Sequence, residues 1–460
     1  MSFQGNVVFL GFGCVGQAVL PLLLNDLKIA PQHILIISKT AAEAEVANTL
    51  GIRFERIKID PYNYLEILSR YLMQGDFLLN LSTGISSYHL ISFCKERKAL
   101  YLDASTEPWE GLYNDASLTS EERTNYALRE SVMQLDKKGP TAILTHGANP
   151  GLVSHFVKQA LVNLAQDNQL KLNTPSTQQD WANLAQLLGI KSIHIAERDT
   201  QISRCIKKDN TFFNTWSIDG LVSEAIQPAE LSWGTHERHW PDEAKMHTAG
   251  SQCAIYLDRP GASVLVRTWT PSGPTHGYLI SHAEAMSIAD YLTVHAEEKI
   301  IYRPTVHYAY SVSPQTKLSL IELVEREYKA QDNTYLMLDD VDGADELGIL
   351  LMGHAKGAYW FGSVLNVDEA KKLAPYNNAT SLQVAAGVLG AMKWAILYPN
   401  AGIVEPEDLD HHMILAYASP YLGLVKGVYT NWTPLDNRKR LFKECLDEED
   451  PWQFLNMRVR

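Results

Sequence analysis

Cysteine is scarce in this sequence of 460 residues. There are five cysteines, and they are Cys14, Cys94, Cys205, Cys253 and Cys445. They form no CxxC pair and follow no regular spacing, so the sequence predicts neither a disulfide framework nor a zinc knuckle. The pairs His236/His239 and His411/His412 match no common ligand spacing either, and we expect no bound metal.

Long apolar runs and low-complexity segments are also lacking. The best apolar stretch, residues 384–397, is interrupted by Lys393. It is shorter than the roughly 20 residues that span a bilayer as a helix. A strand is predicted within a few residues of Met1, which leaves no room for a signal peptide. We therefore expect a cytoplasmic protein that does not insert into membranes.

Basic residues are fewer than acidic ones: the chain has 40 Lys and Arg and 53 Asp and Glu, which give a formal net charge of -13. Such a charge repels nucleic acid and attracts cations, although in most acidic proteins it serves solubility alone. Apolar residues, by contrast, make up 46% of the chain. That content is typical of a globular protein, and the length predicts two or three domains.

The N-terminal third alternates apolar runs with helical stretches. Runs at 6–10, 33–37, 77–81, 99–103 and 141–145 read as buried strands. This alternation predicts an α/β fold, a doubly wound parallel sheet of the Rossmann type. We expect it to span residues 1–150 and to be completed by a returning helical segment near 377–405.

The rest of the chain has a different pattern, with scattered strands separated by Gly and Pro. The candidates lie at 191–195, 253–257, 263–269 and 278–281. We interpret residues 151–376 as an α+β domain for substrate binding and dimerisation. Residues 406–460 are expected to be a C-terminal segment that packs on the two domains.

A glycine turn, Gly11-Phe12-Gly13-Cys14-Val15-Gly16, joins the first strand to the first helix. In such a turn the first Gly allows the bend, the second lets backbone N–H groups approach a pyrophosphate, and the third allows close packing of helix on strand. The sequence therefore predicts dinucleotide binding. The alternative is a strand-to-helix turn without a ligand.

The identity of the dinucleotide is left open by the second strand. NAD-binding domains usually have Asp or Glu at its end, whereas this chain has Ser38-Lys39-Thr40, which also suits a 2′-phosphate. Small polar residues after the next strand are expected to follow the cofactor, or else to form a plain polar turn. They belong to the segment Asn80-Leu81-Ser82-Thr83.

Further candidates follow the later strands of this domain. Glu107 lies just past the strand at 99–103. Asn149-Pro150 follows the strand at 141–145, on the side expected to face the nicotinamide, so both residues are also candidates for cofactor binding. Their position at the carboxyl edge of a parallel sheet favours a place in the cleft. Each has an ordinary structural explanation, since Glu-Pro is common in surface turns and Asn caps helices well.

The second domain adds acidic and aromatic candidates. Glu197 and Glu224 could pair with ammonium groups, while Trp216 between them could cover a methylene chain and attract a cation. His282 could shuttle protons near neutral pH. The alternatives are solvated surface acids, a core tryptophan and a structural histidine.

Longer sequence motifs occur along the chain, several of them with no generic structural explanation. They are GFGCVG, EPW, NYALRE, HGANPG, HIAERDT, NTWSIDG, QPAELSWGTHE, YRPTVHYAY, NAGIVEPEDLD, KGVYT and DPWQF. Over essentially its whole length the chain resembles the bacterial homospermidine synthases, a group related to saccharopine and carboxynorspermidine dehydrogenases. The resemblance implies a homodimer that binds NAD and a small diamine or polyamine.

The resemblance also implies a reaction. Two putrescines, or spermidine and putrescine, would condense to homospermidine with release of ammonia or 1,3-diaminopropane, while NAD is reduced and reoxidised in turn. It implies a cation-binding wall at Trp216, ammonium anchors at Glu197 and Glu224, Glu107 and Asn149 near the reacting carbon, and His282 in the pocket wall. A net oxidoreductase and a non-catalytic dinucleotide sensor remain as alternatives.

Overall fold

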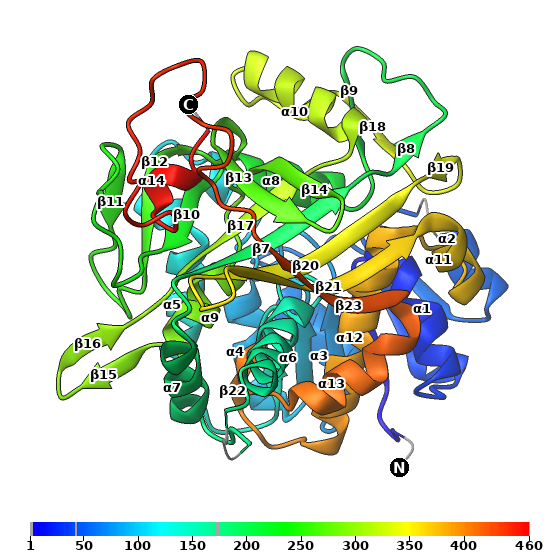
Figure 1. Cartoon of the computed structure of the whole chain (residues 1–460). Helices are drawn as coiled ribbons and strands as arrows, with labels where there is room; N and C mark the ends of the chain where they lie inside the picture. Colours follow the sequence, from blue (N-terminus) through cyan, green and yellow to red (C-terminus); the bar gives the residue numbers. More distant parts are fainter. Residues whose placement is uncertain (1–2, 42–43, 171–173, 460) are drawn as a thin grey trace.

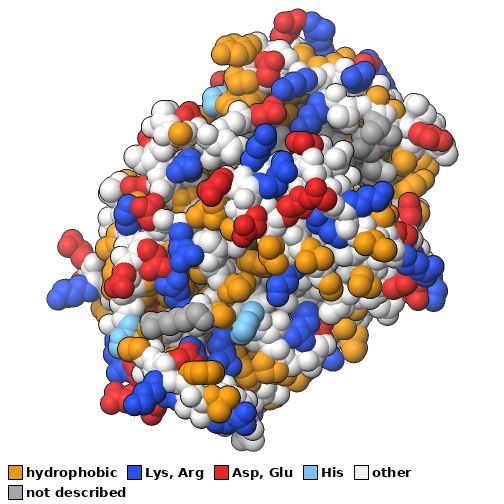
Figure 2. Space-filling model, turned by 90° about the horizontal axis from the view of Figure 1, so that it is seen from above, with side chains coloured by type: hydrophobic (Ala, Val, Ile, Leu, Met, Phe, Trp, Pro, Cys, Tyr) orange, Lys and Arg blue, Asp and Glu red, His pale blue; other side chains and the backbone are white. Residues whose placement is uncertain are grey.

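The computed structural model describes residues 3–41, 44–170 and 174–459. Two large sheets lie one above the other, with helices packed between them (Figure 1). On the face seen in Figure 2, acidic and basic side chains of the described residues are interspersed, so the negative net charge is not gathered there. The two sheets are described in turn, because the candidate site lies where they meet.

The first sheet is parallel throughout, in the order β22-β6-β5-β4-β1-β2-β3. Its strands are β1 (Val7–Leu10), β2 (Ile34–Ser38), β3 (Arg53–Arg56), β4 (Phe77–Asn80), β5 (Leu100–Asp103), β6 (Ala142–Ile143) and β22 (Ile403–Val404). Strands β1, β2, β4 and β5 are buried along their whole length, which explains their continuous apolar runs. The order of β3 to β6 is that of a Rossmann fold, so the predicted fold class is confirmed.

Helices connect these parallel strands and cover the sheet. They are α1 (Cys14–Asn25), α2 (Ala44–Thr49), α3 (Tyr64–Tyr71), α4 (Ser87–Arg97) and α5 (Asn125–Met133). Helix α1 begins directly in the glycine turn and buries Ala18, Val19, Leu22 and Leu23. Helix α5 is capped by Thr124, whose side chain accepts a hydrogen bond from the N–H of Ala127.

Helix α12 (Ala379–Leu397) returns from the second half of the chain and packs between the sheets. It lies along α1 and contacts β5 and β6 on one side and β20 on the other. Its first turn is fixed by a capping box between Asn378 and Ser381. A Cβ at Gly387 would lie 1.9 Å from the carbonyl oxygen of Gly147, so only glycine lets this helix touch the loop after β6.

The length of α12 corrects one expectation from the sequence. The helix has 19 residues and a mean hydropathy of 1.3, so by length and composition it could cross a membrane. However, 78% of its most apolar window is buried inside the protein, as in the core helix of a globular fold. Lys393, which interrupts the apolar run, places its Nζ 3.8 Å from the ring of Tyr417.

The second sheet has the order β13-β14-β17-β7-β20-β21-β23 and is mixed. Its strands are β7 (Ser192–Asp199), β13 (Leu265–Thr270), β14 (Gly273–Tyr278), β17 (Thr305–Ser311), β20 (Ala344–Met352), β21 (Ala358–Asn366) and β23 (Leu424–Thr430). Only β7 and β17 pair in parallel, and the other neighbours are antiparallel. The strand predicted at 278–281 is wrong, because β14 ends at Tyr278.

Smaller elements surround the second sheet. The short strands are β8 (Ile202–Ser203), β9 (Thr211–Asn214), β10 (Pro228–Ser232), β11 (Ala244–Met246), β12 (Ala254–Pro260), β15 (Val294–Ala296), β16 (Lys299–Tyr302), β18 (Asn333–Leu336) and β19 (Val341–Asp342). The helices are α6 (Leu152–Asp167), α7 (Gln178–Leu188), α8 (Ile218–Ile226), α9 (Glu284–Tyr291), α10 (Pro314–Glu325), α11 (Val367–Leu373), α13 (His411–Ala418) and α14 (Phe454–Met457). The hairpin of β15 and β16 projects from the body of the molecule (Figure 1).

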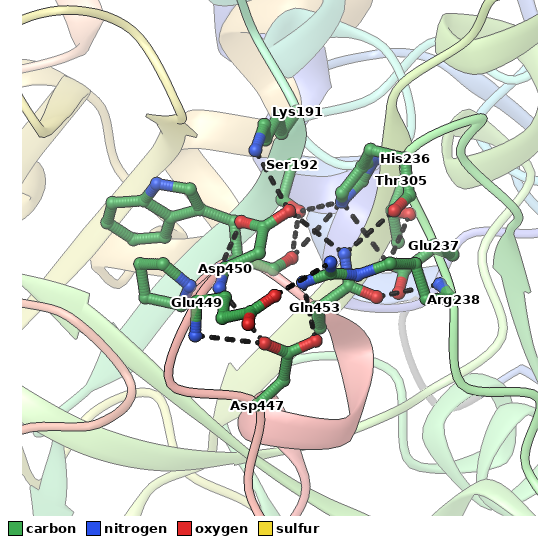
Figure 3. Close-up of polar contacts among 12 residues, drawn as sticks. Lys191, Ser192, His236, Glu237, Arg238, Thr305, Asp447, Glu449, Asp450 and Gln453 are labelled. Carbon is green, nitrogen blue, oxygen red and sulfur yellow. Dashed lines mark hydrogen bonds and ion pairs between the residues drawn. The ribbon is translucent and has the colours of Figure 1, made fainter.

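The C-terminal segment is fastened to the second sheet by a network of polar contacts (Figure 3). Ser192 at the start of β7 donates its hydroxyl to the carbonyl oxygen of Trp452 at 2.9 Å. Glu237 accepts from the N–H of Phe454 at 2.9 Å and from the hydroxyl of Thr305 at 2.7 Å. Burial raises the pKa of Glu237 to about 7. The end of the chain thus braces the strands that carry the candidate site.

Candidate active site

A cavity lies where the carboxyl edge of the first sheet meets the second sheet. The described residues that line it include all six predicted catalytic residues, Glu107, Asn149, Glu197, Trp216, Glu224 and His282. They also include seven of the predicted cofactor-binding residues, Val15, Asn80, Leu81, Ser82, Thr83, Pro150 and again Asn149. The structure therefore brings together candidates from both halves of the chain.

The glycine turn opens a second cavity beside the first. Gly11 has a φ of +81°, and a Cβ there would lie 2.8 Å from the carbonyl oxygen of Leu81, so glycine is required. Gly13 caps the N-terminus of α1 and faces open space, because a Cβ there would have no neighbour within 4 Å. A Cβ at Gly16 would lie 3.0 Å from the ring of Phe12. An open helix N-terminus of this shape fits a pyrophosphate.

The second cavity runs from the glycine turn to the end of β2. The predicted cofactor-binding residues that line it are Gly11, Gly13, Ser38, Leu81, Ser82 and Thr83. Since Leu81, Ser82 and Thr83 line both cavities, the two adjoin. Cys14 and Gly16 are buried at the start of α1 and are not among the described lining residues of either cavity. The residues present fit an extended dinucleotide.

Basic and acidic side chains meet at the outer end of this second cavity. Lys39 follows β2, and its Nζ lies 3.7 Å from a carboxylate oxygen of Asp219 in α8. Both side chains are more than half exposed, so the pair contributes little to stability. Its position matters more, because it joins the end of β2 to the second half of the chain above the cavity.

Glu107 lies in the loop after β5. One of its carboxylate oxygens accepts a hydrogen bond from the N–H of Gly84 at 3.3 Å, and its own N–H donates to the hydroxyl of Ser87 at 3.0 Å. Burial, with the nearby charges of Glu224 and Asp103, raises the pKa of Glu107 to about 8. The carboxyl group is therefore able to gain or lose a proton near neutral pH.

Glu197 lies on β7 and accepts hydrogen bonds from residues in both halves of the chain. Its Oε2 accepts from Nδ2 of Asn149 at 2.6 Å and from the hydroxyl of Tyr308 at 2.5 Å. Burial raises the pKa of Glu197 to about 7, although these two donors favour the ionised form. Asn149 precedes Pro150 across a cis peptide bond, which is part of the loop under α12.

His282 is clamped between two carboxylates. Its Nε2 lies 2.9 Å from Glu224 of α8, and its Nδ1 lies 3.2 Å from Glu284 at the start of α9. Burial opposes the charged ring, but the two carboxylates outweigh it and raise the pKa of His282 well above its usual value. The ring is therefore held as an imidazolium. The sequence had suggested a histidine that shuttles protons near neutral pH, and the two carboxylates disfavour that role.

Trp216 lines the cavity beside α8. It follows β9, is half-buried, and donates from Nε1 to the hydroxyl of Tyr310 at 3.1 Å. A Cβ at Gly220 would lie 3.0 Å from the indole, so glycine in α8 makes room for the ring. The hydrogen bond fixes the edge of the indole and leaves a face available to the cavity.

Sequence reasoning missed several residues of the site. Tyr308 and Tyr310 on β17 lie parallel, with ring centres 5.2 Å apart, and hold Glu197 and Trp216 respectively. Two tyrosines separated by one residue in an apolar run are a signal of one strand face, and this signal was present. Glu284, Thr380 and Val384 were also missed, and the last two line the cavity from α12.

The charge of the first cavity has one sign. Its described lining residues include the carboxyl groups of Glu107, Glu197 and Glu224 but no lysine or arginine, and the imidazolium of His282 is already paired with Glu224 and Glu284. Such a wall fits a cationic molecule with an apolar stem and does not fit a carboxylate. Within the described part of the chain there is no group of three or more His, Cys, Asp or Glu suited to a metal ion.

Comparison with known proteins agrees with this geometry. Residues 7–145 match the model of the saccharopine dehydrogenase NADP binding domain, and residues 147–428 match the saccharopine dehydrogenase C-terminal domain. Homospermidine synthases from Mesorhizobium japonicum and Blastochloris viridis are each 47% identical, covering 100% and 99% of this chain and 97% and 98% of their own. The solved homospermidine synthase of Legionella pneumophila, in complex with NAD, is 50% identical, covers 100% of this chain and 99% of its own, and superposes with a TM-score of 0.94.

Proposed function

Since the chain belongs to the saccharopine dehydrogenase family, and within it to the homospermidine synthases, we propose that it condenses two putrescine molecules into homospermidine and ammonia. Spermidine as the donor would release 1,3-diaminopropane instead. The observation that carries the proposal is the pair of adjoining cavities, one lined by three carboxyl groups and an indole and the other by the dinucleotide turn.

We assign NAD as the cofactor, held by the glycine turn and by residues 80–83. When bound, NAD supplies a hydride acceptor and later returns the hydride, so it is not consumed. The solved relative contains NAD, whereas the family model is named for NADP. Lys39 is the residue that a 2′-phosphate would need, and its pairing with Asp219 favours NAD.

The side chains that line the first cavity bind the amine substrate in this proposal. We assign Trp216 to the wall that covers the methylene chain and attracts the cation, and Glu197 and Glu224 to the anchoring of its ammonium groups. Each step that moves positive charge through the cavity is then stabilised by carboxylates that are already in place. We place the reacting carbon near Asn149, between the dinucleotide turn and Glu197.

Proton transfers need a group that titrates near neutral pH. Glu107 meets this need, because its pKa is raised to about 8, and it lies in the cavity beside residues 80–83. We therefore assign Glu107 to the transfer of protons to and from the amine nitrogen. His282 has a different role, because its imidazolium balances the charges of Glu224 and Glu284.

Two other functions are less well supported. A net oxidoreductase acting on saccharopine-like substrates must bind carboxylates, and the described lining of the cavity offers no lysine or arginine for them. A non-catalytic dinucleotide sensor does not need six polar or aromatic side chains gathered in one cavity. Product analysis separates the three, because only a synthase forms homospermidine without net change in the cofactor.

The test uses purified protein, putrescine and NAD at a small fraction of the putrescine concentration. We expect homospermidine and ammonia in equal amounts by mass spectrometry and ammonia assay, over many turnovers per NAD. Absorbance of the reduced cofactor should stay low throughout. Stoichiometric accumulation of reduced cofactor without homospermidine would contradict the proposal and favour the oxidoreductase.

We also propose that the protein is a cytoplasmic homodimer. This rests on the family relationship and on the cysteine content, and it stays a prediction. Light scattering after size-exclusion chromatography gives the mass in solution, and cell fractionation gives the compartment. A mass of one chain would contradict the dimer.

A further inference from the structure

Three acidic side chains lie together behind the wall of the cavity. Glu197 and Asp199 are two residues apart on β7, and Asp345 on β20 is the register partner of Asp199. Directly opposed residues of an antiparallel pair point to the same face, as do residues two apart on one strand. All three side chains are at most 2% exposed. No ion pair to lysine, arginine or histidine involves them in the described part of the chain.

The hydrogen-bond donors around these three acids are unequal in number. Asp199 accepts from the hydroxyl of Thr215 at 2.6 Å and from the N–H and Nε2 of Gln201 at 2.8 and 3.0 Å. Glu197 accepts from Asn149 and Tyr308. Two or three donors are what a buried carboxylate needs in order to remain ionised.

Asp345 is different, because it has one donor only. Its Oδ2 accepts from the hydroxyl of Thr380 at 2.6 Å, while its buried Oδ1 has no donor among the described residues. In the register of β7 and β20, Asp345 is paired with Asp199 and Glu197 with Leu347, so Asp345 and Glu197 are diagonal neighbours on one face of the sheet. Two neighbouring carboxyl groups form a hydrogen bond only when a proton lies between their oxygens.

We propose that Asp345 is a positioning residue that permanently holds a proton and donates it, as an O–H hydrogen bond, to the carboxylate of Glu197. Glu197 then has three donors, and it stays ionised for the substrate ammonium although it is buried. The inference rests on the proposed function, because it gives Glu197 the role of an ammonium anchor. It deepens that function by naming the group behind the anchor.

The surroundings support this distribution of the proton. The titratable groups that face Asp345 are Glu197 and Asp199 from β7 and Tyr310 from β17. Helix α12 contributes the hydroxyl of Thr380 and the amide of Gln383, which donates to the backbone carbonyl of Asp345 at 3.4 Å. Burial and the two neighbouring carboxylates raise the pKa of Asp345 well above its usual value. The pKa of Asp199 is raised to about 6, so Asp199 is ionised at pH 8.

The first experiment detects the proton in the resting protein. The infrared difference spectrum of wild type minus Asp345→Asn at pH 8 should contain the C=O stretching band of a protonated carboxylic acid. The matched control Asp199→Asn removes a neighbouring carboxyl group that is ionised at this pH, and it should give no such band. A missing band for Asp345→Asn would overturn the proposal, and this result does not depend on turnover.

The second experiment measures how the proton on Asp345 affects kcat/KM and its pH dependence. Asp345→Asn keeps a donor for Glu197, and we expect kcat/KM for putrescine to stay within about threefold of wild type. Asp345→Ala removes the donor, and we expect a roughly tenfold loss, with the acidic limb of the pH profile shifted upwards by about one unit. Equal losses in both variants with unshifted profiles would overturn the proposal. If wild type makes no homospermidine while the infrared band is present, the proposed function fails and the protonated Asp345 stands.

Discussion

The amide Nδ2 of Asn149 lies 2.6 Å from Oε2 of Glu197, and this hydrogen bond joins the loop after β6 of the first sheet to β7 of the second. The contact crosses from the half that carries the dinucleotide turn to the half that carries Glu197 and Glu224. If Glu197 anchors the amine, as we propose, this bond sets the distance between the amine and a bound dinucleotide. This bond and the contacts around it can each be tested by substitution.

Replacing Asn149 by Ala removes a donor to a charged acceptor. Such a bond contributes about 1.5–3 kcal/mol, so we expect kcat/KM for putrescine to fall roughly 10- to 100-fold. Asn163→Ala is the matched control, because Asn163 donates to the hydroxyl of Tyr359 away from the cavity. Steady-state kinetics with putrescine decide the matter, and equal activity of the two variants would argue against a role for Asn149.

Replacing Trp216 by Leu removes the indole face while keeping an apolar side chain. A desolvated cation-aromatic contact is worth about 2 kcal/mol, so we expect KM for putrescine to rise roughly 30-fold. Trp240→Leu serves as the control, because Trp240 is 46% exposed and lines neither described cavity of the site. A KM for putrescine that is unchanged in Trp216→Leu would show that the residue does not bind the cation.

The pKa of Glu107 gives a stability that depends on pH. Because it is raised from 4.5 to about 8, its contribution to stability is complete below pH 4.5 and is lost as the pH rises through 8. Glu107→Gln should thus melt close to wild type at pH 5 and be more stable by about 2 kcal/mol or more at pH 9. Calorimetry at both pH values measures this. Glu110→Gln, in the same loop and exposed, should leave the pH dependence over this range as it is in wild type.

Removing His282 leaves two carboxylates facing each other without their cation. We expect His282→Asn to lower the free energy of unfolding by about 3–5 kcal/mol, since breaking a buried pair strands its charges. Adding Glu284→Gln should restore part of this loss, because one of the two charges is then removed. Urea denaturation of both variants measures it, and a double variant no more stable than the single one would count against the clamp.

Strands β1, β2, β4 and β5 of the first sheet were predictable from the sequence because they are buried along their whole length, whereas β3, which is partly exposed, and the two-residue β22 were not predicted. Runs such as 77–81 are apolar at almost every position, and burial on both faces requires that pattern. The strand expected at 278–281 was wrong for a related reason. That apolar run is a buried loop leading to His282, while the true strand, β14, includes Gly and Pro and is partly or fully exposed until its last two residues.

The sequence indicated which six residues were candidates for the site, but it did not indicate which distant strands and helices bring them together in one cavity. Glu197 and Asp199 are visibly on one strand face, since they are two residues apart. The partner Asp345 lies 146 residues beyond Asp199, and nothing in the local pattern indicates which distant strand will pair with β7. The helix α12 presents the same difficulty, because its place between the sheets depends on contacts with α1 and β20.

The return of the chain through α12 and β22 also sets an order of events during synthesis. The edge of β6 stays without its neighbour until residue 403 has been made, about 260 residues after β6 itself. Until then the first half exposes an unpaired strand edge and the apolar surface that α12 will cover, which are features that invite aggregation. We therefore expect that two fragments produced separately by dividing the gene at residue 146 are each insoluble. During synthesis, neither sheet is complete until the ribosome has made most of the chain.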